Sequence, residues 1–231
     1  MASANGLGVV AVTGGASGLG AAVARAVRAN GGSPVVLDRR EPPFDVETEA
    51  VDLGDTQAAE DAVRRVADRH GRLDAVVAAA GTDSCGKLED VPREDWERVV
   101  TVNLLGTAAV VRAALPYLEA SDGKVVTVAS TLGLRALPDA TAYCASKFGI
   151  VGFTRALSAE TAGRIGVTLL VPGGMQTGFF DGRPERYKPA PDAKLNRPED
   201  VAEAVLFALR QPLGCEVREL LVAPSTETSW P

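Results

Sequence analysis

Residues 9–20 read VVAVTGGASGLG, and this stretch decides the fold. Val9 to Val12 form a short apolar run that is typical of a buried strand. Thr13 leads into a turn that is rich in glycine, and residues 21–29 beyond it are rich in alanine, valine and arginine, which favours a helix. Strand, glycine turn and helix in this order are the context that a dinucleotide-binding turn requires.

The glycine turn has the chemistry to bind a diphosphate. Glycine lacks a Cβ and lets the backbone approach phosphate groups closely, while the start of a helix offers free N–H groups and the positive end of its dipole. The spacing is G-x-x-x-G-x-G instead of G-x-G-x-x-G, and a plain strand-to-helix connection is the alternative for such a turn alone. In this context we predict nucleotide binding, with Gly14, Ser17, Gly18, Leu19 and Gly20 as cofactor contacts.

A tyrosine and a lysine stand four residues apart later in the chain. Tyr143 and Lys147 would therefore share one helix face, with about 5–6 Å between their Cβ atoms. A free tyrosine titrates near 10, so acid/base work near neutral pH needs a fall of roughly 2–3 units. One charge about 4 Å away, at an effective dielectric near 20, supplies about 4 kcal/mol. We therefore expect Lys147 alone to lower the pKa of Tyr143 far enough, although the same spacing is also common on ordinary amphipathic helices.

A serine precedes this pair by thirteen residues. Ser130 follows the apolar run 125–129, so it would lie at the carboxyl end of a buried strand. Open α/β sheets bind their ligands at that end. The position favours a role for Ser130 in the same site as Tyr143.

Together, these motifs resemble the short-chain dehydrogenase/reductase family of the single-domain, Tyr-x-x-x-Lys type. The resemblance extends from Val9 to about Pro224. It rests on residues 13–20, Asn103 in TVN, Ser130, YCASK at 143–147 and PGGMQT at 172–177. It implies one α/β domain over residues 1–231, with a Rossmann-like, doubly wound parallel sheet of about seven strands in the order 3-2-1-4-5-6-7.

The resemblance also implies a reaction and a role for each catalytic residue. The family moves a hydride between a nicotinamide cofactor and an alcohol/carbonyl pair. Tyr143 would be the general acid/base, and Lys147 would lower its pKa and hold the nicotinamide ribose. Ser130 would bind the substrate oxygen, and Asn103 would hold a water that links Lys147 to solvent. The alternative is a non-catalytic NAD(P)-binding sensor or scaffold, which would need the glycine turn but not these four residues.

Two charged residues after the second expected strand bear on the choice of cofactor. Asp38 ends the run Val35 to Leu37, where a carboxylate accepts hydrogen bonds from ribose hydroxyls and repels a 2′-phosphate. The next residue, Arg39, can instead pair with the 2′-phosphate of NADP or stack on adenine. We expect NAD to be favoured over NADP.

The resemblance assigns further cofactor contacts. The family usually carries Asn-Asn-Ala-Gly after its fourth strand, whereas residues 78–81 here read AAAG. The contacts expected from the family pattern are Asp52 and Leu53 near the adenine, Ala80 and Gly81 near the ribose, and Pro172, Gly173, Met175 and Thr177 at the nicotinamide carboxamide.

The apolar pattern predicts alternating strands and helices throughout. We expect strands near residues 8–12, 34–38, 49–52, 74–80, 123–129, 166–171 and 217–222, and helices near 18–30, 56–70, 93–120, 140–162 and 198–210. Only thirteen residues separate Asp38 from Asp52, and Pro42 and Pro43 are among them. Because a crossover normally needs a dozen residues or more, we predict that the helix after the second strand is missing or reduced to a turn.

Composition excludes several classes of function. A net charge of −6 and a pI near 5.0 argue against nucleic acid as a partner. Three scattered cysteines fit a reducing cytoplasm better than a disulfide framework, and none has a metal-ligand partner at suitable spacing. Residues 1–8 lack the features of a signal peptide, and no continuous apolar run approaches the ~18 residues of a membrane helix. We expect a cytoplasmic protein without a bound metal or a membrane span.

Three loops are expected to form the substrate surface, namely residues 82–86, 131–137 and 178–196. The last of them belongs to a lid-like stretch at 178–197, here called the lid segment, which contains Phe179, Phe180 and Tyr187. Arg135 and Arg183 are lone loop arginines, which usually face water. The helices near 93–120 and 140–162 resemble those that pair subunits in the family, so we expect a homotetramer, with a dimer as the alternative.

Overall fold

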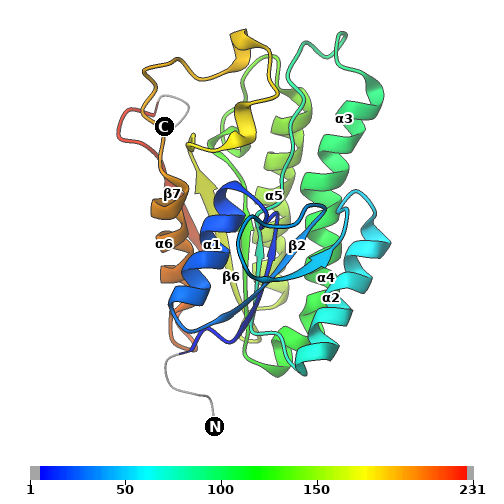
Figure 1. Cartoon of the computed structure of the whole chain (residues 1–231), viewed down its shortest axis with the longest axis vertical. Helices are drawn as coiled ribbons and strands as arrows, with labels where there is room; N and C mark the ends of the chain where they lie inside the picture. The colour runs from blue at the N-terminus through cyan, green and yellow to red at the C-terminus, as the bar shows by residue number, and fades with distance from the viewer. Residues whose placement is uncertain (1–5, 228–231) are drawn as a thin grey trace.

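The computed structural model describes residues 6–227, and a seven-stranded parallel sheet runs through them (Figure 1). The strands are β1 (Val9–Thr13), β2 (Ser33–Asp38), β3 (Glu47–Ala50), β4 (Ala75–Ala78), β5 (Lys124–Val128), β6 (Gly166–Pro172) and β7 (Glu219–Val222). They lie in the order β3-β2-β1-β4-β5-β6-β7, which confirms the predicted topology. Because β1 lies between β2 and β4, the chain reverses its direction of travel across the sheet there, and such a switch point opens a ligand crevice at the carboxyl ends of the strands.

Helices cover both faces of the sheet. α1 (Gly18–Ala29) and α6 (Pro198–Leu209) pack together on one face, and α2 (Thr56–His70), α4 (Thr107–Ala120) and α5 (Thr141–Glu160) cover the other (Figure 1). The helix boundaries agree with the prediction to within two residues.

The two faces explain why the strands read as continuous apolar runs. In β1, Val9 and Ala11 join the core under α2 and α4, whereas Val10 and Val12 join the core under α1 and α6. Side chains alternate between the two faces of a strand, so a sheet that is covered on both faces must be apolar at every position. All five residues of β1 are buried.

A long helical segment crosses the second face and changes its geometry in the middle. α3 (Arg93–Val100) continues into a π-helical turn, η1 (Thr101–Gly106), and then into α4, which Pro116 does not interrupt. By length and composition alone, the segment Arg93–Ala120 could cross a membrane. This was not predicted, because the segment contains no continuous apolar run of about 18 residues. About half of its most apolar window, 56%, is buried in the protein, as in an ordinary core helix.

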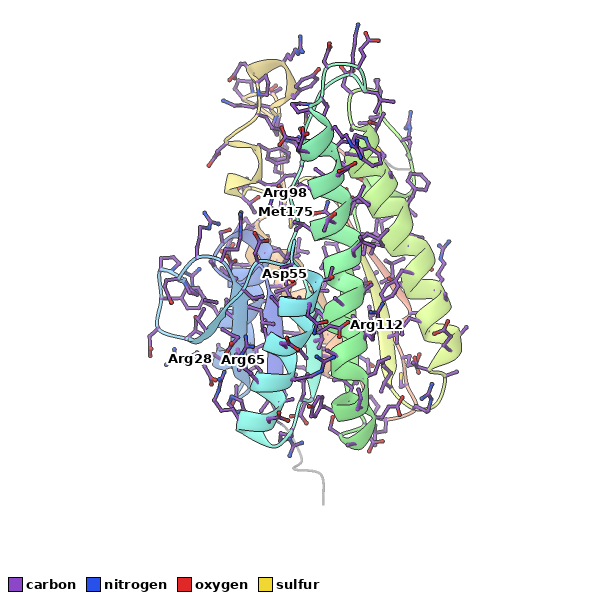
Figure 2. All side chains as sticks on the ribbon, turned by 90° about the vertical axis from the view of Figure 1, so that its right-hand side faces the viewer. Arg28, Asp55, Arg65, Arg98, Arg112 and Met175 are labelled. Carbon is purple, nitrogen blue, oxygen red and sulfur yellow. The ribbon has the colours of Figure 1, made fainter. Side chains whose placement is uncertain are left out.

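The crossover from β2 to β3 lacks a helix, as predicted. Within the described chain, residues 39–46 contain only bends and extended backbone, and β3 pairs directly with β2. β3 reads ETEA, and two arginines of α2 hold its glutamates: Arg65 bonds Glu49 at 2.7 Å and Arg69 bonds Glu47 at 2.7 Å. Figure 2 labels Arg65 on α2, beside β2 and β3. Ion pairs to α2 therefore cover the face of β3 that carries Glu47 and Glu49.

The prediction that residues 1–8 lack a signal peptide rests mostly on residues 1–5, which lie outside the described residues. Among the residues that the structure does describe, no group of three or more His, Cys, Asp or Glu side chains could hold a metal ion.

Candidate active site

The four residues expected to be catalytic come from three elements that meet at the carboxyl end of the sheet. Ser130 lies just past β5 and caps a short 3-10 turn, Tyr143 and Lys147 lie in the first two turns of α5, and Asn103 lies in η1. Ser130 is hydrogen-bonded to Tyr143. Gly81 lies beside both Asn103 and Lys147. A Cβ atom on Gly81 would be 3.7 Å from Asn103 Oδ1 and 3.8 Å from Lys147 Nζ.

Burial dominates the acid/base properties of Tyr143. Desolvation raises the pKa of Tyr143 to about 12, Ser130 and Arg183 act to lower it, and Asp83 acts to raise it further. The expectation that Lys147 alone lowers this pKa to near neutrality is wrong for the protein's own groups. That expectation counted one charge about 4 Å away at an effective dielectric near 20 and left out the loss of water around the phenol, which disfavours the ionised form.

Lys147 is also almost fully buried, and the loss of water disfavours its charged form. Burial lowers the pKa of Lys147 to about 8, while Asp83 acts in the opposite direction. Its Nζ atom donates to the Val128 carbonyl at 2.8 Å and lies 5.6 Å from the centre of the Tyr143 ring. The ammonium is therefore fixed beneath the phenol by the end of β5.

Asn103 is a buried clamp on the loop after β4. Its Oδ1 atom accepts from the Thr82 amide at 2.8 Å, and its Nδ2 atom donates to the Thr82 carbonyl at 2.9 Å and to Ser146 Oγ at 3.0 Å. The Asn103 carbonyl accepts from Thr107 Oγ1 at 2.8 Å. Turns of π-helix occur often at functional sites, and this one delivers Asn103 into the space between Gly81 and Lys147. Its expected bond to a water stays a prediction.

The glycine turn has the tight geometry that its residues predict. Gly14 has a φ of +70°, and a Cβ there would lie 2.7 Å from the Ala80 Cα atom. A Cβ on Gly20 would lie 2.3 Å from the Gly14 carbonyl oxygen. Ser17 precedes α1 without capping it through its side chain, so the first turn of α1 presents amide groups that a diphosphate could bind.

Asp38 ties the end of β2 to the glycine turn. Its Oδ2 atom accepts from the Ala16 amide and its Oδ1 atom from the Arg40 amide, both at 3.0 Å. The Arg40 guanidinium reaches Ser17 Oγ at 3.0 Å. Sequence reasoning missed Arg40, although it lies only two residues beyond Asp38, and it places a cation beside the turn.

The remaining residues expected at the adenine and ribose are close to this turn. The Gly54 amide and the Arg98 guanidinium donate to the Asp52 carboxylate, and Arg39 lies 3.8 Å from it. Burial acts to raise the pKa of Asp52, but these neighbours hold that pKa below its usual value. Leu53 is buried. The Ala80 amide donates to Thr13 Oγ1 at 3.0 Å, which bends the chain out of β4 earlier than predicted.

The segment expected at the nicotinamide follows β6. Pro172 ends that strand, and the Gly173 amide donates to the Val222 carbonyl at 2.9 Å. Met175 forms an isolated bridge with Asn196 at the far end of the lid segment. The Thr177 side chain approaches Gly18, where a Cβ would lie 3.4 Å from its methyl group. The expected nicotinamide segment and the expected diphosphate turn are therefore neighbours.

The lid segment arches over the carboxyl ends of the strands (Figure 1) and contacts the site. The Phe179 and Tyr143 ring centres are 5.7 Å apart. Arg183 does not face water as expected of a lone loop arginine: its side chain is 18% exposed and pairs at 2.5 Å with Asp83, which is 5% exposed. Arg135 is exposed, as expected. A loop at 82–86 was predicted, but no pattern in the sequence indicated that Asp83 would be buried against the lid segment.

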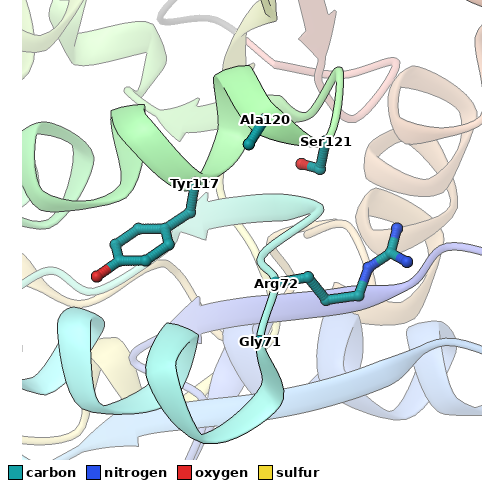
Figure 3. Close-up of a pocket in the computed structure, with 5 residues that line it drawn as sticks. All are labelled: Gly71, Arg72, Tyr117, Ala120 and Ser121. Carbon is teal, nitrogen blue, oxygen red and sulfur yellow. The ribbon is translucent and has the colours of Figure 1, made fainter.

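A separate hollow of about 270 Å³ lies at the opposite end of the sheet (Figure 3). Its lining residues Gly71, Arg72, Tyr117, Ala120 and Ser121 come from the ends of α2 and α4 and the start of β4. Its polar groups are already engaged, since Tyr117 bonds Asp68 and Ser121 bonds the Leu73 carbonyl. None of the predicted site residues lines it, and the amino ends of parallel strands are not where such sheets bind ligands.

Comparisons with known proteins agree with this geometry. A family model for short chain dehydrogenases matches residues 8–188. An uncharacterized oxidoreductase of Staphylococcus aureus (strain MW2) is 31% identical over 228 residues, which cover 94% of this chain and 96% of that protein. The 3-oxoacyl-[acyl-carrier-protein] reductase FabG of Thermotoga maritima is 30% identical, over 86% of this chain and 89% of its own.

Two solved structures are similar in fold and contain a nicotinamide dinucleotide. One is an alcohol dehydrogenase from the archaeon Thermococcus sibiricus, complexed with 5-hydroxy-NADP, with a TM-score of 0.83, 26% identity, and coverage of 93% of this chain and 95% of that one. The other is a short chain dehydrogenase from Burkholderia cenocepacia J2315 in complex with NADP, with a TM-score of 0.82, 26% identity, and coverage of 94% and 97%.

Proposed function

The chain belongs to the short chain dehydrogenase family of oxidoreductases, and on that premise we propose that it interconverts an alcohol and a carbonyl, with Tyr143 as general acid/base and a nicotinamide cofactor as hydride carrier. The observation that carries the proposal is the hydrogen bond between Ser130 and Tyr143 directly above the buried Lys147. A non-catalytic sensor or scaffold would have no need to bury an ammonium beside a phenol.

The residues present fit a nicotinamide dinucleotide. The uncapped first turn of α1 supplies amide donors for the diphosphate, and Asp38 retains acceptor capacity for a ribose hydroxyl because each carboxylate oxygen has two lone pairs. Pro172, Gly173, Met175 and Thr177 would hold the nicotinamide end, and Lys147 its ribose. When bound, this cofactor supplies or accepts the hydride.

The protein's own groups then handle the proton. With its pKa near 12, the Tyr143 phenol is protonated at neutral pH, so it can donate a proton to a carbonyl oxygen. The Ser130 hydroxyl would bond the same oxygen as charge develops on it. Lys147, with a pKa near 8, is mostly charged at pH 7 and would stabilise the tyrosinate that remains. In the direction of alcohol oxidation, Tyr143 must first lose its proton, so that direction would need a higher pH.

For the cofactor, we propose that the site accepts NADP as well as NAD. Arg40, beside Ser17, and Arg39 are cations placed to attract a 2′-phosphate, whereas the Asp38 carboxylate repels one. Two amide donors already offset part of the Asp38 charge. The solved relatives with NADP do not support the preference for NAD that the sequence suggested.

We further propose a homotetramer, with a dimer as the alternative. Leu105 in η1 and Phe148 on α5 are 49% and 45% exposed, on the helical elements expected to pair subunits. Light scattering on the purified protein would test this, and a monomer at micromolar concentration would refute it.

The central experiment is a panel of carbonyls and alcohols, assayed with NADH, NADPH and their oxidised forms by nicotinamide absorbance. Turnover of at least one pair is expected. A protein that binds either cofactor and turns over no member of a broad panel would favour the sensor or scaffold.

A further inference from the structure

A buried ion pair joins the lid segment to the loop after β4. Arg183 Nη2 lies 2.5 Å from Asp83 Oδ2, and the two side chains are only 18% and 5% exposed. They are separated by a hundred residues in sequence, and both lie close enough to Tyr143 to act on its charge. A pair at such a depth rarely adds net stability compared with apolar residues, but breaking it is costly because one charge stays buried without its partner.

Asp83 is held rigidly in its own loop. Its Oδ1 atom accepts from the Ser84 amide at 2.7 Å, and the Cys85 thiol donates to its Oδ2 atom at 3.0 Å. The preceding residue, Thr82, is the one that Asn103 clamps through both backbone groups. The Asp83 carboxylate therefore has a fixed position, and Arg183 of the lid segment can bind it there.

Arg183 organises the aromatic side chains of the lid segment. Its guanidinium carbon lies 5.0 Å from the centre of the Phe179 ring and 4.6 Å from that of Phe180. Phe179 in turn contacts Tyr143. Within the described residues, Arg183 Nε is buried without a hydrogen-bond partner, so the guanidinium is not fully satisfied in this arrangement. A second bond, from Tyr187 to Asp139 at 3.1 Å, ties the same lid to the loop before α5.

We propose that Asp83 and Arg183 are positioning residues for the reaction: their ion pair latches the lid segment over the substrate, holds Phe179 against Tyr143 and balances the charge beside the phenol. The proposal rests on the proposed oxidoreductase function. Neither residue touches the reacting atoms in this arrangement; both act through Tyr143.

The two charges act on Tyr143 in opposite directions. Asp83 raises the pKa of Tyr143, and Arg183 lowers it. The other groups that face the phenol are Ser130 after β5, and Cys144 and Lys147 on its own helix, while Cys85 and Asp139 flank Asp83. Removing the aspartate charge should therefore lower the pKa of Tyr143, and removing the arginine charge should raise it.

The pH profile of kcat tests this balance. For Asp83→Asn we expect the tyrosine limb of the profile to move to lower pH, and for Arg183→Gln to higher pH. Each shift should be about one unit, the effect of one charge roughly 10 Å away at an effective dielectric near 20. The double variant should return close to the wild-type profile. Arg183→Lys, which keeps the charge but loses the planar fork, should keep the wild-type profile while raising KM for the substrate.

Hydrogen exchange tests the latch independently of turnover. Amides of residues 178–188 should exchange faster in Asp83→Asn and Arg183→Gln than in the wild type. Glu185→Gln is the matched control, because it breaks only the more exposed pair with Lys188 on the same lid. Failure of the proposed function would show as a wild type without turnover on any substrate. The latch would be overturned by unchanged lid exchange in the folded variants, or by single variants whose pH profiles move in the same direction; if Asp83→Asn does not fold, Arg183→Lys and Arg183→Gln carry the test.

Discussion

Asn103 bonds both backbone groups of Thr82, at 2.8 and 2.9 Å, and so fixes the loop that passes between the glycine turn and Lys147. Asn103→Ala would leave the partly buried Thr82 amide and carbonyl without these bonds. We expect a loss of about 1–3 kcal/mol in the free energy of unfolding in urea, with a larger relative loss in kcat than in cofactor affinity.

Asn30→Ala is the control for the Asn103 variant. Asn30 also bonds a backbone carbonyl, that of Ala26, but at the end of α1 and away from the four residues proposed to be catalytic. It should cost stability without a selective effect on kcat. Equal effects of the two substitutions on kcat would contradict the clamp.

Removing the Tyr143 hydroxyl tests the proton step. Tyr143→Phe keeps the ring that packs against Phe179 and loses the group that bonds Ser130. We expect kcat to fall by at least about 10²–10⁴-fold, with cofactor affinity, measured by fluorescence titration, nearly unchanged. Tyr117→Phe, which loses a bond to Asp68 at the other end of the molecule, should keep wild-type kcat. A Tyr143→Phe enzyme with substantial turnover would exclude the tyrosine as acid/base.

Lys147 should leave a signature in the pH dependence of stability. Its pKa is lowered on folding, so between about pH 8 and 10.5 the unfolded chain binds more protons than the folded one, and stability rises with pH. The rise should amount to about 1 kcal/mol from pH 8 to 9. From about pH 8 upward the raised pKa of Cys85 acts increasingly in the opposite direction, and so does that of Tyr143 from about pH 9.

Urea unfolding across this range, for the wild type and Lys147→Met, checks that signature. The variant should lose most of the rise between pH 8 and 9. A small rise should remain from Lys124, whose pKa burial also lowers. An unchanged slope in Lys147→Met would mean that the ammonium is not desolvated.

The sequence predicts much of the fold because local and global signals agree there. The run of valines in β1, the glycine turn and the helix starts all follow from residues close together in the chain, and the topology followed from the family pattern. The four residues proposed to be catalytic were likewise found from motifs in the sequence, such as the four-residue spacing of Tyr143 and Lys147. The Asp83–Arg183 pair does not, because it joins two loops whose approach depends on the complete fold.

The raised pKa of Tyr143 also could not be predicted from the spacing of residues in the sequence. The distance to Lys147 suggested a lowered pKa, but the result depends on how much water both groups lose, and desolvation is a property of the packed site. Arg40 was missed for a different reason: its backbone amide and its guanidinium meet Asp38 and Ser17 only once the loop after β2 turns back on the glycine turn.

The choice of cofactor should depend on Asp38 and Arg40. Arg40→Ala removes the cation beside Ser17, so kcat/KM with NADPH should fall about 10-fold or more relative to NADH. Asp38→Asn removes the negative charge but keeps an acceptor for the Ala16 amide, and it should move the preference toward NADPH. Steady-state kinetics with both reduced cofactors decide the point. A ratio that moves in neither variant would place the selecting residues elsewhere.

The edge strand β3 should be sensitive to salt because charged side chains connect it to α2. Arg65 and Arg69 of α2 reach Glu49, whose side chain is only 15% exposed. Glu49→Gln removes the charge from both contacts and should lower the free energy of unfolding in urea by about 0.5–1 kcal/mol at low salt. At 1 M NaCl, where screening acts over about 3 Å, most of that difference should vanish. Arg93→Met breaks the highly exposed pair with Glu97 and should have no measurable effect at either salt concentration. A Glu49→Gln loss that stays constant with salt would show that packing, not charge, holds β3 in place.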